Sequence, residues 1–328
     1  MSEMISEKKQ IPNALVSVGV PVYNGEKYIG EALDSMLNQT YRNWECNIVN
    51  NASTDNTESI VQEYANKDKR FKLHNYSDFF PIVDNWNRTV LHISENAKYF
   101  KILQADDWLN ERYLEEMVSV MEKYPTIGMC SSYRIDDTKI KCDGLNINDG
   151  QFYEGKEMLM RHINEEIDIT GSATTVLFKV EYLKKLPQYP EINDPKDFHC
   201  DTQLAFDMMS ISDVGFVFQV LSYTRWHPDA YTSNTCVLYN TFLNAREIRL
   251  YKLRNLNADI EKEYRRHRIK YAYYLYSKWL RRDKKNLKWH KDHERRPIKF
   301  SEYLKAFLIY NIFSRQIAKI PQKLKKSK

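Results

Sequence analysis

The feature that most constrains the fold is an alternation of short apolar runs and amphipathic helices beginning near residue 15. Residues 15–21 read LVSVGVP, which is typical of a strand buried on both faces. The runs WECNIV, FKLHNY and KYFKIL follow as further strands, with helical segments between them. The first helix carries apolar residues at helical spacing: Ile29, Ala32, Leu33, Met36 and Leu37. This order predicts a mainly parallel α/β sheet with helices on both faces.

Polar loops follow three of the predicted strands: PVYN at 21–24, NNAST at 50–54 and QADDW at 104–108. Ligands bind beyond the carboxyl ends of the strands in such sheets, so we expect these loops to form one site. Asp106 and Asp107 are adjacent carboxylates that repel each other. A divalent metal would remove that cost, and so would an ordinary surface turn. Both interpretations remain open on these residues alone.

Composition is that of a soluble globular chain of 328 residues, with 42% hydrophobic and 28% charged residues. The five cysteines are scattered without a C-x-x-C pair, which argues against a disulfide framework or a zinc site and indicates a reducing compartment. The N-terminus lacks the apolar core of a signal peptide, and no run approaches the ~18 apolar residues of a spanning helix. We therefore expect a cytoplasmic protein.

Several enzyme classes lack their motif in this chain. No G-x-G-x-x-G follows the first strand, no Walker A lysine loop is present, and no G-x-S-x-G elbow appears. What remains is a set of Asn, Asp and Ser side chains that can hold a base and ribose, with a carboxylate pair suited to a metal that neutralises a diphosphate. This combination suits a sugar nucleotide.

At these motifs the chain resembles the family-2 glycosyltransferases, which have the GT-A fold. The matching stretches are VSVGVPVYNGEKYIGEALDSMLNQTY, ECNIVNNASTDNT, YFKILQADDW and, more weakly, HCDTQLAF with YTRWHPDAYTS. The resemblance implies a Rossmann-like, mainly parallel mixed sheet. It also implies inverting, metal-dependent transfer of a sugar from a nucleotide-sugar donor, with a UDP-sugar favoured. The acceptor would be a hydroxyl of a glycan or lipid-linked glycan, in the synthesis of cell-surface polysaccharide.

The resemblance also implies a nucleotide pocket at the first two strand ends. Pro21, Tyr23 and Asn24 would line the base pocket. Asn50 and Asn51 stand where the family usually has two Asp, the first of which contacts the base or ribose. An amide can still donate and accept hydrogen bonds, but this difference puts the nucleotide preference in question.

For the metal, the resemblance implies Mn²⁺ or Mg²⁺ bound by Asp106. Gln104 replaces the first Asp of the family's D-x-D motif. Asp107 would support Asp106 or face the donor sugar. His227, in TRWHPD, would be an additional metal or phosphate ligand, although a lone His is more often a packing residue.

The catalytic base implied by the resemblance is Asp201, with Cys200 in the position that is often Glu in the family. The alternative for Asp201 is an N-cap of the helix that follows. As general base it would deprotonate the acceptor hydroxyl, which then attacks the anomeric carbon. One such displacement inverts the anomeric configuration, and the metal stabilises the departing diphosphate.

The composition changes near residue 240, where basic, aromatic and helical sequence begins. We expect an N-terminal extension at 1–14, a GT-A domain at 15–238 and a basic helical region at 239–328. Within that region, residues 264–296 are dense in Lys and Arg with interspersed Tyr and Trp. A solvated helical face or a nucleic-acid surface would have this composition. YLKAFLIYNIFSRQIAKI at 303–320 is too short to span a bilayer, so we favour an anionic membrane surface and expect no nucleic acid.

Two other functions stay open from sequence. A sugar-1-phosphate nucleotidyltransferase could use a similar sheet, but the Gly-rich basic loop that it needs is missing after VSVGVP. A non-catalytic sugar-nucleotide or glycan-binding protein would explain Asn50, Gln104 and Cys200. Nucleotide release from a donor sugar distinguishes an enzyme from such a binding protein.

Overall fold

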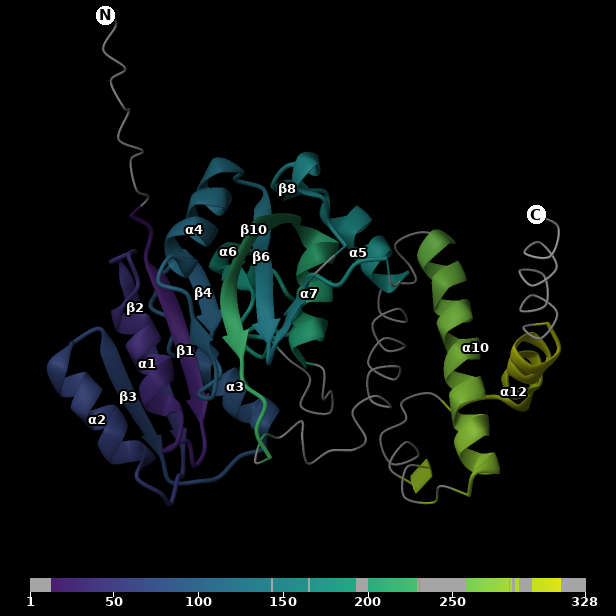
Figure 1. The fold of residues 1–328 in the computed structure, drawn as a ribbon, viewed down its shortest axis with the longest axis horizontal. Helices are drawn as coiled ribbons and strands as arrows, with labels where there is room; N and C mark the ends of the chain where they lie inside the picture. The colour runs from purple at the N-terminus through teal and green to yellow at the C-terminus, as the bar shows by residue number, and fades with distance from the viewer. Residues whose placement is uncertain are drawn as a thin grey trace, which may run out of the picture. The chain divides into compact units, whose positions relative to one another are not determined.

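The computed structural model describes residues 13–142, 144–164, 166–192, 200–228, 230, 258–282, 284, 287–288 and 297–313. The chain forms two compact units (Figure 1): Met1–Pro195 with Cys200–Pro228, and Lys196–His199 with Asp229–Lys328. The first unit contains the sheet and the second is helical. Most of the expected extension at 1–14, the expected boundary at 238/239 and much of 283–296 lie outside the described residues.

The sheet has ten strands in the described part of the chain, and its main order is β3-β2-β1-β4-β9-β6-β10-β5. Neighbours in the first half run parallel: β1 with β2 and β4, and β2 with β3. The strand bounds are β1 Val16–Val22, β2 Trp44–Asn51, β3 Phe71–Tyr76, β4 Tyr99–Ile102, β5 Trp108–Leu109, β6 Ile127–Asp136, β7 Lys139–Lys141, β8 Phe152–Tyr153, β9 Leu177–Lys179 and β10 Asp213–Thr224.

The short strand β9 joins the two halves of the sheet, because it pairs antiparallel with both β4 and β6. Strands β4 and β6 are therefore parallel to each other, and β10 is parallel to β6. The carboxyl ends of β1, β2, β4, β6 and β10 consequently lie at one edge of the sheet. The predicted mainly parallel mixed α/β sheet is confirmed.

Helices cover both faces of the sheet (Figure 1). Val18 and Val20 of β1 belong to the core that contains the apolar residues of α1 and α4. Gly19, between them, points to the opposite face, where an added Cβ would come within 2.5 Å of Thr89 Cβ of α3. Glycine is needed here because the helix backbone approaches the strand closely. The helices of this unit are α1 Ile29–Leu37, α2 Thr57–Lys67, α3 Ile82–Val90, α4 Tyr113–Lys123, α5 Gly155–Ile163, α6 Val180–Leu183 and α7 Cys200–Ile211, with the 3₁₀ turn η1 Ile147–Asp149.

The second unit contains α10 (Ala258–Leu280) and α12 (Phe300–Phe307), the latter continuing as the π-helix η2 (Leu308–Phe313). Tyr271 and Leu275 of α10 form a small core with Tyr303 of α12. Among the residues that the structure describes, no helix combines the length and apolar character needed to span a bilayer.

A stacked histidine pair lies at the β3 end of the sheet. The rings of His74 and His92 have centroids 3.6 Å apart at an interplanar angle of 19°. His74 Nε2 lies 3.0 Å from Asn47 Oδ1, which accepts when this nitrogen is protonated. Burial, and then the nearby His92, lower the pKa of His74 to about 4, and burial lowers the pKa of His92 as well. The fold therefore favours the neutral pair.

We expect this pair to make the fold acid-sensitive. In the unfolded chain His74 has a pKa near 6.5, whereas in the folded chain its pKa is about 4. The stability that neutral His74 contributes is therefore complete above pH ~6.5 and is lost as the pH falls toward 4. His74→Gln retains an amide donor for Asn47 but cannot titrate. The urea midpoints of the wild type and of His74→Gln should be similar at pH 7. Between pH 7 and 5 the midpoint of the wild type should fall further than that of the variant. Parallel losses would contradict this assignment.

Candidate active site

The loops after β1 and β2 are locked together by hydrogen bonds. Asn24 N donates to Ser53 Oγ at 2.9 Å, and Thr54 N donates back to Asn24 Oδ1 at 2.8 Å. Asn24 adopts a left-handed backbone with φ of 50°, a conformation that Asn tolerates better than most residues. Glu26 N donates to Asp55 Oδ2 at 3.0 Å. The two predicted nucleotide loops therefore form one unit at the sheet edge.

Asn50 and Asn51 lie at the end of β2 with side chains that are already engaged. Asn50 accepts from Ser53 N at 3.2 Å and donates to Asn75 Oδ1 at 2.9 Å. Asn51 donates to Phe80 O at 2.8 Å and accepts from Phe80 N at 3.0 Å. Both residues are buried. Their hydrogen bonds hold together the segments that follow β2 and β3.

Tyr23 differs from these asparagines because its ring is exposed at the same edge. Phe79, also exposed, meets Tyr23 edge-to-face with centroids 4.7 Å apart. Pro21 is buried within β1 and sets the course of the strand into this loop. Of the residues expected to line a base pocket, Tyr23 and Asn24 are therefore the accessible ones.

A carboxylate and an imidazole from distant parts of the chain meet next to these loops. His227 Nε2, beyond the end of β10, lies 3.0 Å from Asp106 Oδ2, beyond the end of β4. Arg225 Nε donates to the Asp106 carbonyl at 3.2 Å, and the ring of Tyr28 packs against His227 with centroids 4.6 Å apart. The Asp106 side chain remains one-third exposed. The two expected metal ligands are thus brought together.

Asp107 points the other way, into the protein. It is 2% exposed and accepts hydrogen bonds from Thr174 Oγ1 at 2.6 Å and from Arg225 N at 3.1 Å. Burial, with the charge of neighbouring Asp106, raises the pKa of Asp107 to about 7. Between the two roles expected for Asp107, this geometry favours support of Asp106 over contact with a donor sugar.

A buried lysine forms a hydrogen bond with the backbone of the segment 172–175. Lys101 of β4 is completely buried and donates from Nζ to the carbonyl of Thr174. Its ammonium lies 4.3 Å from the ring centroid of Tyr113, whose hydroxyl donates to the Thr175 carbonyl at 3.0 Å. Burial lowers the pKa of Lys101 well below its usual range. The sequence signal that could have indicated this role is a lysine within the apolar run YFKIL.

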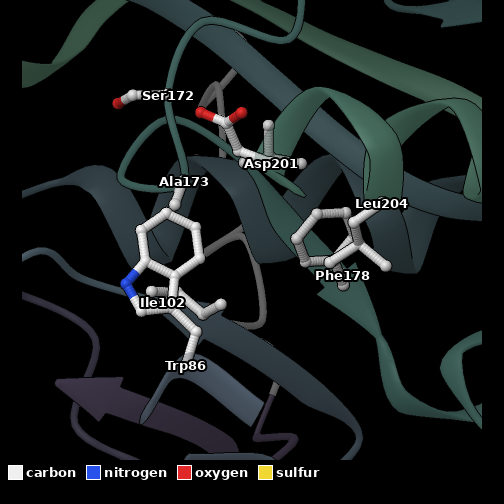
Figure 2. Close-up of a pocket in the computed structure, with 8 residues that line it drawn as sticks. Trp86, Ile102, Ser172, Ala173, Phe178, Asp201 and Leu204 are labelled. Atoms are coloured by element: carbon white, nitrogen blue, oxygen red, sulfur yellow. The ribbon is translucent and has the colours of Figure 1, made fainter. Parts of the chain in front are cut away.

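Asp201 lies in the first turn of α7 and lines a pocket with the same segment (Figure 2). Ser172 and Ala173 line this pocket together with Asp201, while Trp86, Phe178 and Leu204 provide apolar walls. Thr202 N donates to Asp201 Oδ1 at 2.7 Å. Since α7 as described begins at Cys200, Asp201 stands inside the helix and not at the N-cap position. One short segment, 172–175, therefore contacts Asp107 and borders Asp201.

The family model for glycosyl transferase family 2 matches residues 17–186 of this chain. An uncharacterized glycosyltransferase of Rickettsia typhi is 30% identical over 235 residues, covering 70% of this chain and 69% of the relative. The chain belongs to this family. Another relative, a glycosyltransferase of Haemophilus influenzae, is 37% identical over 119 residues, and this chain spans only 36% of its length.

Solved structures of other glycosyltransferases share the fold. S. aureus TarS 1–349 in complex with UDP-GlcNAc superposes with a TM-score of 0.58 at 16% identity, over 89% of this chain and 79% of that one. The mannosyltransferase PcManGT from Pyrobaculum calidifontis, in complex with GDP-Man and Mn²⁺, gives 0.51 at 20% identity, over 73% and 64%. The GT-A fold expected from the sequence is confirmed.

The glycosyltransferase site fits a metal that binds together with its nucleotide. Within the described part of the chain, no three His, Cys, Asp or Glu side chains gather as a metal cluster. The Asp106–His227 pair supplies one carboxylate and one imidazole at a suitable separation. Mg²⁺ commonly takes only one or two protein ligands and completes its shell with phosphate oxygens and water. Gln104, in the first position of the family's D-x-D motif, accepts from Thr174 Oγ1 at 3.4 Å through its side-chain oxygen.

Sequence reasoning missed Thr174 and Arg225, because neither residue type signals a role by itself. We expect Thr174→Val to destabilise the enzyme by about 1–3 kcal/mol, since it removes the shortest hydrogen bond to buried Asp107 and leaves the longer one from Arg225 N. Thr40→Val is the matched control, because the Thr40 hydroxyl bonds Glu115 on the surface and its loss should cost within about 0.5 kcal/mol. Denaturant midpoints measure both, and equal effects would show that the Asp107 bond is unimportant.

Proposed function

We propose that this enzyme transfers a sugar from a nucleoside-diphosphate donor, a UDP-sugar in the first instance, to a hydroxyl group with inversion of the anomeric centre. The observation that carries this proposal is the Asp106–His227 pair at 3.0 Å. This pair lies at the sheet edge that also carries the exposed Tyr23–Asn24 loop. Segment 172–175, which contacts Asp107, borders the pocket that contains Asp201. These are the three parts that a donor, its diphosphate and an acceptor require.

On the donor side, Tyr23 offers an exposed ring for the base, and the loop held by Asn24 and Ser53 borders it. Asn50 holds that loop in place by accepting a hydrogen bond from Ser53 N. Asp106 and His227 would hold Mn²⁺ or Mg²⁺, which stabilises the leaving diphosphate as a Lewis acid. The complex of PcManGT with GDP-Man and Mn²⁺ supports a divalent metal, and the TarS complex with UDP-GlcNAc supports a UDP-sugar.

On the acceptor side, Asp201 removes the proton from the attacking hydroxyl. Trp86, Phe178 and Leu204 provide apolar walls beside this carboxylate. Attack on the anomeric carbon opposite the departing diphosphate is a single in-line displacement, and a single displacement inverts configuration. The proposed acceptor is a glycan or lipid-linked glycan, in the synthesis of cell-surface polysaccharide.

We place the enzyme in the cytoplasm. Nucleotide sugars carry a charged diphosphate that does not cross a bilayer unaided, so a donor made in the cytoplasm is used there. The scattered cysteines agree with a reducing compartment, and those that the structure describes are all buried: Cys46, Cys130, Cys142 and Cys200.

Asp106→Asn tests the metal site. The amide keeps a hydrogen-bonding oxygen for His227 but loses the charge that binds the cation, so Mn²⁺ should no longer tighten UDP binding and turnover should fall at least about a hundredfold. Titration calorimetry with UDP, with Mn²⁺ and with chelator, measures the first effect. Asp137→Asn is the matched control, an exposed carboxylate in a left-handed turn that Asn tolerates. Unchanged metal dependence in Asp106→Asn rejects the site.

Asp201→Asn tests the general base. Turnover should fall by about 10²–10⁴-fold while UDP binding is unchanged, because the base acts on the acceptor. The amide oxygen can still accept from Thr202 N, so α7 should keep its first turn. Rates per folded molecule, with a panel of UDP- and GDP-sugars, provide the measurement. A variant that is less stable but equally active would instead assign Asp201 a structural role.

A further inference from the structure

The helix α12 exposes an apolar stripe in the second unit. Phe300, Leu304, Phe307 and Leu308 are 81%, 49%, 38% and 38% exposed. Their spacing of four, three and one places them on one side of a helix. Large apolar side chains gathered in this way mark a surface that another phase or molecule covers.

The opposite side of α12 is anchored, so the orientation of the stripe is set by the fold. Arg268 of α10 is 1% exposed and forms a two-point ion pair with Glu302, at 2.8 and 2.7 Å. Ala306 is fully buried, and Tyr303 packs against the core of Tyr271 and Leu275. Bidentate, buried pairs of this kind hold geometry well. The stripe is therefore presented outward by a helix that is fixed on its other side.

Basic residues dominate the exposed charge of the second unit. Among the side chains of this unit that the structure describes, the exposed charged ones are Lys or Arg, whereas Glu261 and Glu302 are partly buried and paired with Arg. Lys305 lies on α12 and Lys299 is its N-cap residue, and Trp279 and Leu280 are exposed at the end of α10. The exposed basic residues are Lys262, Arg265, Arg266, Arg281, Arg282, Lys284, Lys288, Lys299 and Lys305.

We propose that the apolar stripe of α12 is the surface by which this enzyme binds an anionic membrane. An interfacial helix buries its apolar side among acyl chains near the headgroups, while Lys and Arg beside it meet anionic lipids. Apolar burial alone would also suit a protein partner, but the exposed Lys and Arg of the described residues complement an anionic lipid surface. Aromatic side chains such as Trp279 favour the same interface.

Flotation of the full chain with liposomes tests this surface. Vesicles of phosphatidylcholine alone are compared with vesicles containing about one-third phosphatidylglycerol, at low and high salt. Leu304→Asp should lower the ratio of bound to free protein about tenfold or more, because it places a carboxylate at the centre of the stripe. Leu91→Asp, at a leucine 61% exposed beside α3 in the first unit, is the matched control and should float as the wild type does.

Charge is tested by Lys299→Glu with Lys305→Glu, which should lower binding to anionic vesicles and weaken its dependence on salt. Equal flotation of Leu304→Asp and Leu91→Asp overturns the proposal. So does a change of oligomeric state in Leu304→Asp without a change in flotation, which would make the stripe a protein contact. Retention on RNA with no flotation overturns it too. Donor turnover without vesicles should stay unchanged in Leu304→Asp, so this test and the transferase assignment can fail separately.

Discussion

The hydrogen bond from Thr174 to buried Asp107 is the interaction on which the candidate site depends most. A carboxylate that is 2% exposed is costly unless donors surround it, and Thr174, with the backbone of Arg225, supplies them. Because these donors come from separate segments, satisfying one carboxylate ties the end of β4 to segment 172–175 and to the end of β10. Lys101 Nζ donates a hydrogen bond to the backbone carbonyl of the same Thr174.

This arrangement explains why two adjacent aspartates can serve opposite purposes. Asp107 turns inward and carries the desolvation cost, with a pKa raised to about 7. Asp106 turns outward to His227, where its carboxylate remains accessible to a cation or a substrate. The loops at β1 and β2 add a second fixed unit, since Asn24 and Ser53 bond across them. A donor would therefore meet groups that are already positioned, which lowers the ordering cost of binding.

Sequence reasoning predicted more of the fold than of the site. Apolar runs and helical spacing predicted the parallel strands, and the ordered motifs identified the family that the comparisons then showed. The motifs also pointed to Asp106, His227 and Asp201. They assigned the metal to Asp106 but left two roles open for Asp107, because the sequence does not show which of two adjacent aspartates is buried. Nor did they distinguish Tyr23, which is exposed, from Asn50 and Asn51, which are buried and bonded within the protein.

The sequence by itself determined the α/β class, the strand-end loops and the basic character of the C-terminal region, because local periodicity and composition are properties of contiguous residues. Only the tertiary structure decided which distant residues meet: His227 with Asp106, Thr174 with Asp107, and Arg268 with Glu302. The first two pairings depend on strand order and on the antiparallel insertion of β9, and the third depends on the packing of α12 against α10. They also depend on the need of each buried polar group for a partner, and that need is met by residues far along the chain.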